Sequence, residues 1–121
     1  MNRAALLVKI ITGKEKEAEE ILKSQKYQDA TKKVCLSAGL KGFSDFLLGN
    51  NLLRLIEFDG DREKALKDLG WAINSEASFK DQDSRLRALI EGAPQGKLLD
   101  PREFVPFILS SLMSELYRWE P

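Results

Sequence analysis

The chain has 121 residues, of which 43% are hydrophobic and 31% are charged. This composition is ordinary for a folded protein of this size and argues against disorder, so we expect a single domain over residues 1–121. Nineteen Lys and Arg residues balance nineteen Asp and Glu residues. A chain without basic excess lacks the electrostatic footprint needed to neutralise phosphates, and no nucleic-acid partner is predicted.

The sequence contains no histidine and one cysteine, Cys35. Without histidine, a Ser-His-Asp triad and a histidine-ligated zinc or haem site are excluded within this chain. One cysteine allows no internal disulfide, which suits a reducing, cytoplasmic setting. Asp81 and Asp83 resemble the start of a calcium loop, but no glycine or terminal glutamate follows at the required spacing. We therefore expect no metal site and no cofactor, and Cys35 is interpreted as a small buried hydrophobe.

The first half of the chain predicts a strand, a helix and a hairpin. The apolar run 4–11 is typical of a strand buried on both faces, and it is too short to span a membrane. A small-residue cleavage site is missing, so no signal peptide is predicted. Residues 14–23 predict an exposed helix. Residues 24–37 indicate a loop or a short helix. Two apolar runs, 42–48 and 52–58, flank a Gly-Asn-Asn cluster and predict a β-hairpin.

The second half predicts two helices and a final strand. Asp59 or Asp61 can cap a helix that continues to about residue 73, and apolar spacing indicates a second helix over 79–90. A loop at 92–96 precedes a short helical turn that Asp100 and Pro101 open. Residues 112–119 alternate in polarity and predict a strand that ends the chain.

This order of elements defines the expected fold class. It is an α+β fold on the ferredoxin-like split βαβ plan, with a four-stranded antiparallel sheet and helices on one face only. The first strand is apolar on both sides. Alternation points Ala5, Leu7 and Ile11 one way and Leu6, Val8 and Ile10 the other. An apolar second face needs a cover, so we expect a homodimer that packs sheet against sheet.

Three segments resemble a known family. The strand at 5–9, the hairpin end at 55–57 and the closing Tyr-Arg-Trp-Glu at 117–120 are similar to tetracenomycin-type polyketide cyclases. The segment 51–61 is closer still to the SchA/CurD-like domains of spore-pigment and polyketide gene clusters. The resemblance spans nearly the whole chain in the same order of elements, and it implies the dimeric α+β barrel superfamily.

The chain also departs from that family. The cyclases carry a cavity-facing histidine on the third strand, and Arg54 occupies the corresponding position here. An acidic residue that typically follows the first helix is absent until Asp29. The resemblance therefore carries over the fold and the polyketide context better than it carries over the mechanism.

Arg54 is the candidate catalytic residue. It lies within a strongly apolar strand, where an unpaired guanidinium is costly to bury. A two-residue turn at Gly49-Asn50 would place Asp45 directly opposite it, so one interpretation is a structural ion pair. The other is that Arg54 faces a cavity, with Asp45 beside the ligand. There it would stabilise an enolate or carboxylate oxygen, since an always-protonated guanidinium can donate but cannot act as a base.

Trp71 and Tyr117 are candidate substrate-binding residues. Trp71 can stack on a planar polyketide or fill the core beside Phe79. Tyr117 and Trp119 alternate on one face of the last predicted strand, where a dimer or core contact competes with binding of a phenolic ligand.

Three functions remain open from the sequence. The leading hypothesis is a polyketide cyclase or aromatase that orients a poly-β-ketone for ring closure in an apolar pocket. The second is a cofactor-independent monooxygenase that oxidises an anthrone. The third is a non-catalytic dimer that binds small molecules, which the missing histidine favours.

Overall fold

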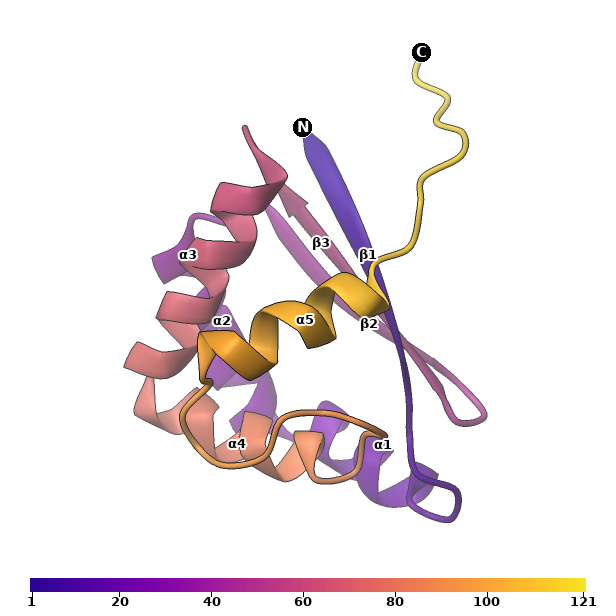
Figure 1. Cartoon of the computed structure of the whole chain (residues 1–121), viewed down its shortest axis with the longest axis vertical. Coiled ribbons are helices and arrows are strands. Elements are labelled where there is room, and N and C mark those ends of the chain that lie inside the picture. The colour runs from indigo at the N-terminus through magenta and orange to yellow at the C-terminus, as the bar shows by residue number, and fades with distance from the viewer.

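The computed structural model describes residues 1–121 as an antiparallel sheet covered on one face by helices (Figure 1). In chain order the elements are β1 (Asn2–Lys9), α1 (Glu15–Lys23), α2 (Gln25–Ala38), β2 (Gly42–Leu48), β3 (Asn51–Phe58), α3 (Arg62–Ser75), α4 (Ala77–Arg87) and α5 (Pro101–Ser111). The three strands are ordered β1-β3-β2. The expected α+β class and the placement of helices on one face are confirmed.

The hairpin is confirmed with its predicted turn. Leu48 pairs with Asn51, so Gly49 and Asn50 form a two-residue turn. Gly49 has a φ of 58°, a left-handed conformation that glycine adopts without steric cost. This turn length determines which residues of the two strands pair with one another, and it places Asp45 opposite Arg54.

The segment 24–37, expected to be a loop or a short helix, is instead part of the 14-residue helix α2. The Ser24 side chain caps its first turn by accepting a hydrogen bond from the backbone N–H of Tyr27. Gly39 ends it in the left-handed conformation. Tyr27, Ala30 and Val34 lie on one face at helical spacing and are buried, so tertiary packing stabilises a helix whose sequence is mostly polar.

The region after residue 100 also differs from expectation. The predicted short turn is the 11-residue helix α5, capped by Asp100 with Pro101 in its first turn. The final strand expected at 112–119 is absent as a strand of the sheet. Leu112 makes one isolated bridge to Leu6, and residues 113–121 continue without regular hydrogen bonding. The sheet therefore has three strands where four were expected.

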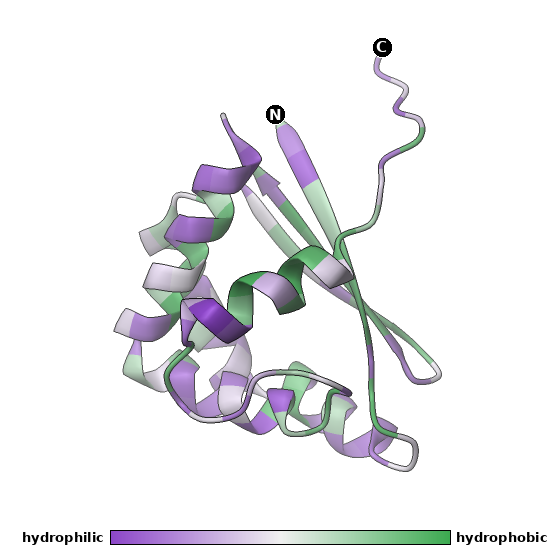
Figure 2. Ribbon diagram, in the orientation of Figure 1, coloured by the Kyte–Doolittle hydropathy of each residue, from purple (hydrophilic) through white to green (hydrophobic).

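Alternate side chains of the strands build the core. One face of the sheet packs on the helices, and its most buried members are Leu6, Leu52, Ile56 and Phe58. Helical residues complete this core from the other side; among them are Val34, Leu69, Phe79 and Leu86. In Figure 2, hydrophobic (green) and hydrophilic (purple) stretches alternate along the helices. No helix combines the length and the apolar character needed to cross a bilayer.

The opposite face of the sheet, here called the outer face, is uncovered. Strand alternation places six apolar side chains on it: Ala5, Leu7, Phe46, Leu48, Leu53 and Leu55. Phe46 is 56% exposed and Leu48 is 81% exposed. The sheet therefore presents an apolar surface that nothing in this chain covers.

Candidate functional site

Asp45 and Arg54 form the centre of the candidate site. They are directly paired residues of β2 and β3, so their side chains emerge on the same, helix-covered face. Arg54 Nε donates to Asp45 Oδ1 at 2.8 Å, and Arg54 Nη2 donates to Asp45 Oδ2 at 3.2 Å. The predicted pairing of these residues is confirmed, and it is a bidentate ion pair.

Tyr27 of α2 joins this pair from the helical layer. Its hydroxyl donates to Asp45 Oδ2 at 3.0 Å and accepts a hydrogen bond from Arg54 Nη2. The tyrosine ring is buried and packs at a tilt against Phe79, with ring centroids 5.8 Å apart. We call Tyr27, Asp45 and Arg54 the polar cluster.

The polar cluster has a defined protonation state. Burial raises the pKa of the Tyr27 phenol well above its ordinary value, so the hydroxyl stays neutral and keeps a proton to donate. Burial is the largest single effect on the pKa of Arg54 and lowers it, but Asp45, Tyr27 and Asp83 together outweigh burial and the net change is upward. The Phe43 ring adds a cation–π contact, with Arg54 Cζ 4.6 Å from its centroid.

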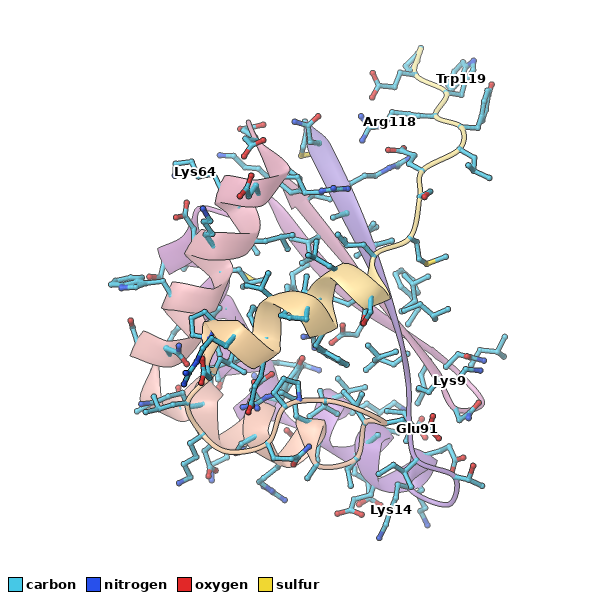
Figure 3. All side chains as sticks on the ribbon, in the orientation of Figure 1. Lys9, Lys14, Lys64, Glu91, Arg118 and Trp119 are labelled. Carbon is cyan, nitrogen blue, oxygen red and sulfur yellow. The ribbon has the colours of Figure 1, made fainter.

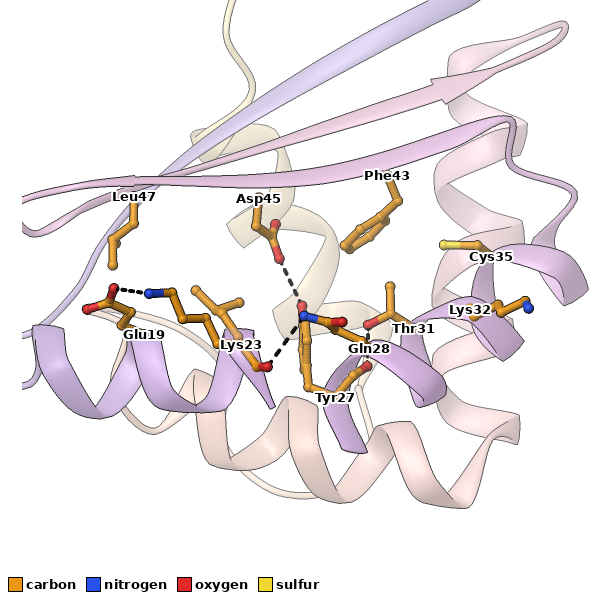
Figure 4. Close-up of a pocket in the computed structure, with 11 residues that line it drawn as sticks. Glu19, Lys23, Tyr27, Gln28, Thr31, Lys32, Cys35, Phe43, Asp45 and Leu47 are labelled. Atoms are coloured by element: carbon orange, nitrogen blue, oxygen red, sulfur yellow. Dashed lines mark hydrogen bonds and ion pairs between the residues drawn. The ribbon is translucent and has the colours of Figure 1, made fainter. Parts of the chain in front are cut away.

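The cluster forms part of the wall of an open groove between α1, α2 and β2 (Figure 4). The groove has a volume of about 730 Å³, within the range of small-molecule sites. Tyr27 and Asp45 lie midway along it, and the Glu19–Lys23 ion pair, 2.7 Å between Nζ and Oε1, lies at one end. The remaining lining residues are Leu22, Gln28, Thr31, Lys32, Cys35, Phe43 and Leu47.

A second, smaller space lies between the sheet and helices α3, α4 and α5. This inner cavity measures about 70 Å³, has mostly apolar walls, and is bordered by Arg54 and Asp83. It has room for a few water molecules but none for fused rings. Because Tyr27 and Asp45 border the groove while Arg54 borders the inner cavity, the polar cluster separates the two spaces.

One nitrogen of Arg54 is free for a further partner. Nε and Nη2 make all the hydrogen bonds of this side chain, and Nη1 makes none within the protein. Every fully buried side-chain nitrogen or oxygen has a partner, so Nη1 is accessible to a small molecule such as water. Arg54 therefore holds Asp45 and Tyr27 in place and retains donor capacity.

The other predicted binding residues lie away from the cluster. Trp71 on α3 is 67% exposed and borders a separate groove of about 480 Å³ between α3 and α5, so it neither fills the core nor roofs the polar cluster. Tyr117 is 76% exposed in the segment after α5. Of the four predicted residues, the structure brings together Asp45 and Arg54.

Sequence reasoning missed Tyr27 and misjudged Cys35. Ser24 three residues before Tyr27 was the available signal, because a serine cap starts a helix and orients the residues of its first turn. Cys35 is only partly buried and borders the groove. Burial raises the pKa of its thiol to about 11, so it is mostly protonated at neutral pH.

Comparisons with known proteins bear on the fold. No protein-family model matches the chain, and no curated protein matches its sequence. Among solved structures, tetracenomycin F2 cyclase from Streptomyces glaucescens, a type-II polyketide cyclase, aligns with 100% of this chain and 99% of that chain. The TM-score is 0.63 and the sequence identity is 16%. The chain has the fold of a type-II polyketide cyclase. The family resemblance noted in the sequence thus agrees with the architecture.

Proposed function

We propose that this protein binds a poly-β-ketone or aromatic polyketide intermediate in the groove between α2 and β2 and directs its ring closure. The observation that carries this proposal is the polar cluster in the wall of a groove large enough for fused rings. The whole-chain likeness to a polyketide cyclase supports it.

The reaction needs no cofactor. A base removes a proton from a methylene between two carbonyls, and the resulting enolate carbon attacks a distant carbonyl carbon of the same molecule. The new C–C bond forms as the C–O π bond breaks, and the oxygen takes up a proton. Loss of water then gives the aromatic ring, so atoms and electrons balance without an oxidant or a reductant.

The polar cluster can supply each proton movement. Asp45 borders the groove as a carboxylate and accepts the methylene proton. Tyr27, kept neutral by burial, donates a hydrogen bond to the oxygen that gains negative charge. Its hydroxyl lies 3.0 Å from Asp45 Oδ2, so the proton on Asp45 can return to the product through it. Arg54 is a positioning residue that holds the Asp45 carboxylate and the Tyr27 hydroxyl in place.

Most of the rate enhancement comes from orientation. A poly-β-ketone has several reactive methylenes, and confinement in a shaped groove selects the pair of carbons that meet. Phe43 and Leu47 lie on either side of Asp45 along β2 and give the groove apolar contacts, and Leu22 also lines it. A chain held there presents one methylene to the carboxylate.

A second candidate function is binding without turnover. It is favoured by the pairing of Asp45, whose two oxygens are both already engaged by Arg54 and one also by Tyr27. A carboxylate with both oxygens engaged in hydrogen bonds is less available to a proton on a ligand. In this case the groove holds a hydroxylated aromatic and the cluster serves as a hydrogen-bonding wall.

The assembly that we propose for either function is a homodimer. The apolar outer face remains uncovered in one copy, and a second copy offers a matching surface. Burying Phe46 and Leu48 against a partner removes the largest exposed apolar side chains of the sheet from water.

Two substitutions of equal size test where the ligand binds. Thr31→Trp fills the groove beside the polar cluster, and Val105→Trp fills the α3–α5 groove as the matched control. Titration with a dihydroxyanthraquinone, followed by absorbance, should show binding to wild type and to Val105→Trp and a loss of binding to Thr31→Trp. The reverse pattern would move the site to the α3–α5 groove and overturn the proposal.

Turnover is measured with a synthetic aromatic β-polyketone that has one ring still open. Chromatography should show a single cyclised product with wild type, and Asp45→Asn should lose ring closure while it still binds the anthraquinone. Binding without product would select the second candidate. Uptake of molecular oxygen with an anthrone would select the monooxygenase.

A further inference from the structure

The groove between α3 and α5 takes no part in the proposed ring closure. Its volume of about 480 Å³ is within the range of small-molecule sites, and it shares no lining residue with the groove of the polar cluster. Figure 1 shows α5 beginning beside α3 and running away from it toward β1. The two helices form the walls of a separate site.

Each helix turns one side toward this groove. The lining residues of α3 include Leu66 and Gly70, those of α5 include Val105 and Leu109, and within each helix they recur at intervals of three or four residues. α3 packs a different set of residues into the core, and α5 fully buries only Ser111 although it carries five large apolar side chains. Both helices therefore present apolar surface beyond what the core uses.

The groove has a closed floor. Leu66, Phe104 and Ile108 also border the inner cavity, so their side chains separate the two spaces. The helices come together at Gly70, where an added Cβ would stand 3.4 Å from Phe104 Cε1. A molecule that enters the groove thus lies along the two helices without reaching Arg54.

The charged lining residues lie at one end of the groove. They are Arg62, Glu63 and Lys67, all in the first two turns of α3. Glu63 and Lys67 pair with each other at 3.5 Å, and Arg62 has no ion-pair partner. At the other end the Asn74 amide donates to the carbonyl oxygen of Leu99 at 3.1 Å and accepts from its N–H at 2.8 Å, so it is satisfied. One free cation therefore marks one end, and an uncharged apolar run follows it.

The distance between the two ends sets the length of a ligand. Asn74 follows Arg62 by twelve residues of α3, which is about 18 Å at the helical rise per residue. An extended carbon chain advances about 1.2 Å per bond, so about 15 bonds cover this distance. Trp71, 67% exposed, and Leu109, 60% exposed, lie along the way and would be removed from water by such a chain.

We infer that the α3–α5 groove binds a long-chain fatty acid, with the carboxylate at Arg62 and the alkyl chain directed toward Asn74. A guanidinium pairs with a carboxylate through two parallel hydrogen bonds, which suits the free Arg62. The inference goes beyond the proposed ring closure and is independent of it, because the two grooves have no residue in common.

The first test is calorimetric titration with palmitate, a chain of about this length, below the concentration at which it aggregates. Leu109→Glu places a charge in the path of the alkyl chain and should weaken binding by about tenfold or more. Leu36→Glu is the matched control, because Leu36 is also an exposed helical leucine and lines neither groove. Absence of binding to wild type, or equal losses for the two variants, would overturn the inference.

Two substitutions already described separate this site from the groove of the polar cluster. Val105→Trp should lose palmitate and keep the dihydroxyanthraquinone, and Thr31→Trp should do the reverse. Loss of palmitate in Thr31→Trp alone would place the fatty acid beside the polar cluster and overturn the inference. Loss of the anthraquinone site would leave palmitate binding unaffected, so the failure of one proposal is distinguishable from the failure of the other.

The head and the chain of the ligand are tested separately. Arg62→Gln should lower the affinity for palmitate by about three- to fivefold and leave that for hexadecanol unchanged, and Arg85→Gln on α4 is the control. Affinity should rise by about twofold per methylene, because an open groove covers part of each group, and level off near 16 carbons. Equal effects of Arg62→Gln on the two ligands would overturn the assigned position of the carboxylate.

Tryptophan fluorescence reports the direction of the chain. The protein has two tryptophans, and Trp119 lies beyond the body of the molecule (Figure 3), so Trp119→Phe leaves Trp71 as the sole reporter. Trp71 is about 14 Å along α3 from Arg62. Palmitate brominated toward its methyl end should quench Trp71, and palmitate brominated beside its carboxylate should bind without quenching. Quenching by neither, or by the second alone, would overturn the proposed orientation.

Discussion

Two arginine–aspartate ion pairs in this protein have similar geometry but different roles. Asp83 and Arg87 lie one turn apart on α4, joined by Nε and Oδ2 at 2.7 Å, and both side chains are 6% exposed. Arg87 Nη1 donates to the carbonyl oxygen of Pro94 and Nη2 donates to that of Gly96, each at 2.6 Å. Every nitrogen of this guanidinium donates a hydrogen bond, and the pair holds the loop after α4 in place.

The Asp45–Arg54 pair differs in access and in spare capacity. Its side chains are 12% and 18% exposed, Asp45 borders the groove, and Arg54 Nη1 has no partner within the protein. Tyr27 links this pair to α2, whereas Arg87 is linked to a loop. A saturated pair stabilises structure, whereas the Asp45–Arg54 pair can meet a ligand through Asp45, which borders the groove.

The largest expected effect is on the saturated pair. Arg87→Ala leaves the Asp83 carboxylate buried without its partner and frees two loop carbonyl groups, so the free energy of unfolding should fall by about 3–5 kcal/mol. Arg85→Ala is the control, because Arg85 is exposed on the same helix. Urea denaturation measures the free energy of unfolding of both variants. Similar losses for the two variants would show that the pair does not fasten the loop.

The accessible pair should be less costly to break. Arg54→Leu should lower the free energy of unfolding by about 2 kcal/mol, because water reaching the groove solvates the stranded Asp45. Replacing both residues with leucine should recover part of that loss while abolishing ring closure. A loss for Arg54→Leu as large as that for Arg87→Ala, with anthraquinone binding and ring closure unchanged, would make this pair structural as well.

The sequence was informative where local geometry decides the outcome. A two-residue turn fixes which side chains lie opposite one another, so the pairing of Asp45 with Arg54 follows once the turn consists of Gly49 and Asn50. Tyr27 was not predictable in the same way. Its helix is mostly polar and depends on packing against distant strands, and such long-range stabilisation leaves only a weak local pattern.

Residues 112–119 show the opposite error. Their alternating residues predict a strand, and the Leu6–Leu112 bridge with the Arg3–Glu115 pair reproduces a strand register, yet no backbone ladder forms beyond Met113. Alternation reports which residues share a face, and it does not report whether a neighbour is present to bury that face.

Tyr27→Phe should have a modest effect on stability and a large effect on chemistry. The ring still packs against Phe79, and Asp45 keeps Arg54, so the free energy of unfolding should fall by about 1 kcal/mol. Ring closure should fall because the proton donor is gone. Burial raises the pKa of Tyr27 above the ordinary 10.0, so the neutral donor persists and no loss of activity from phenolate formation is expected below pH 10.0. Unchanged ring closure in Tyr27→Phe would remove the phenol from the mechanism.

The smallest expected effect concerns Cys35, whose rate of alkylation reports whether a ligand occupies the groove. Because this is the only cysteine, alkylation by iodoacetamide reads a single site that borders the groove. The thiolate is the reactive form, and a thiol pKa of about 11 makes it scarce at neutral pH. A dihydroxyanthraquinone bound beside the polar cluster should slow alkylation at pH 8, and Thr31→Trp, which excludes the ligand, should abolish that protection.

The pH profile of the same reaction separates burial from ligand binding. In the folded protein the alkylation rate should keep rising by about tenfold per pH unit beyond 9.0, the ordinary pKa of the thiol, because burial holds the thiol protonated. In urea the same cysteine should level off near 9.0, since the unfolded chain no longer shields it. A folded-state rate that also levels off there would mean that Cys35 is fully solvated. The protection experiment would then report on the surface of α2 and not on the groove between α2 and β2.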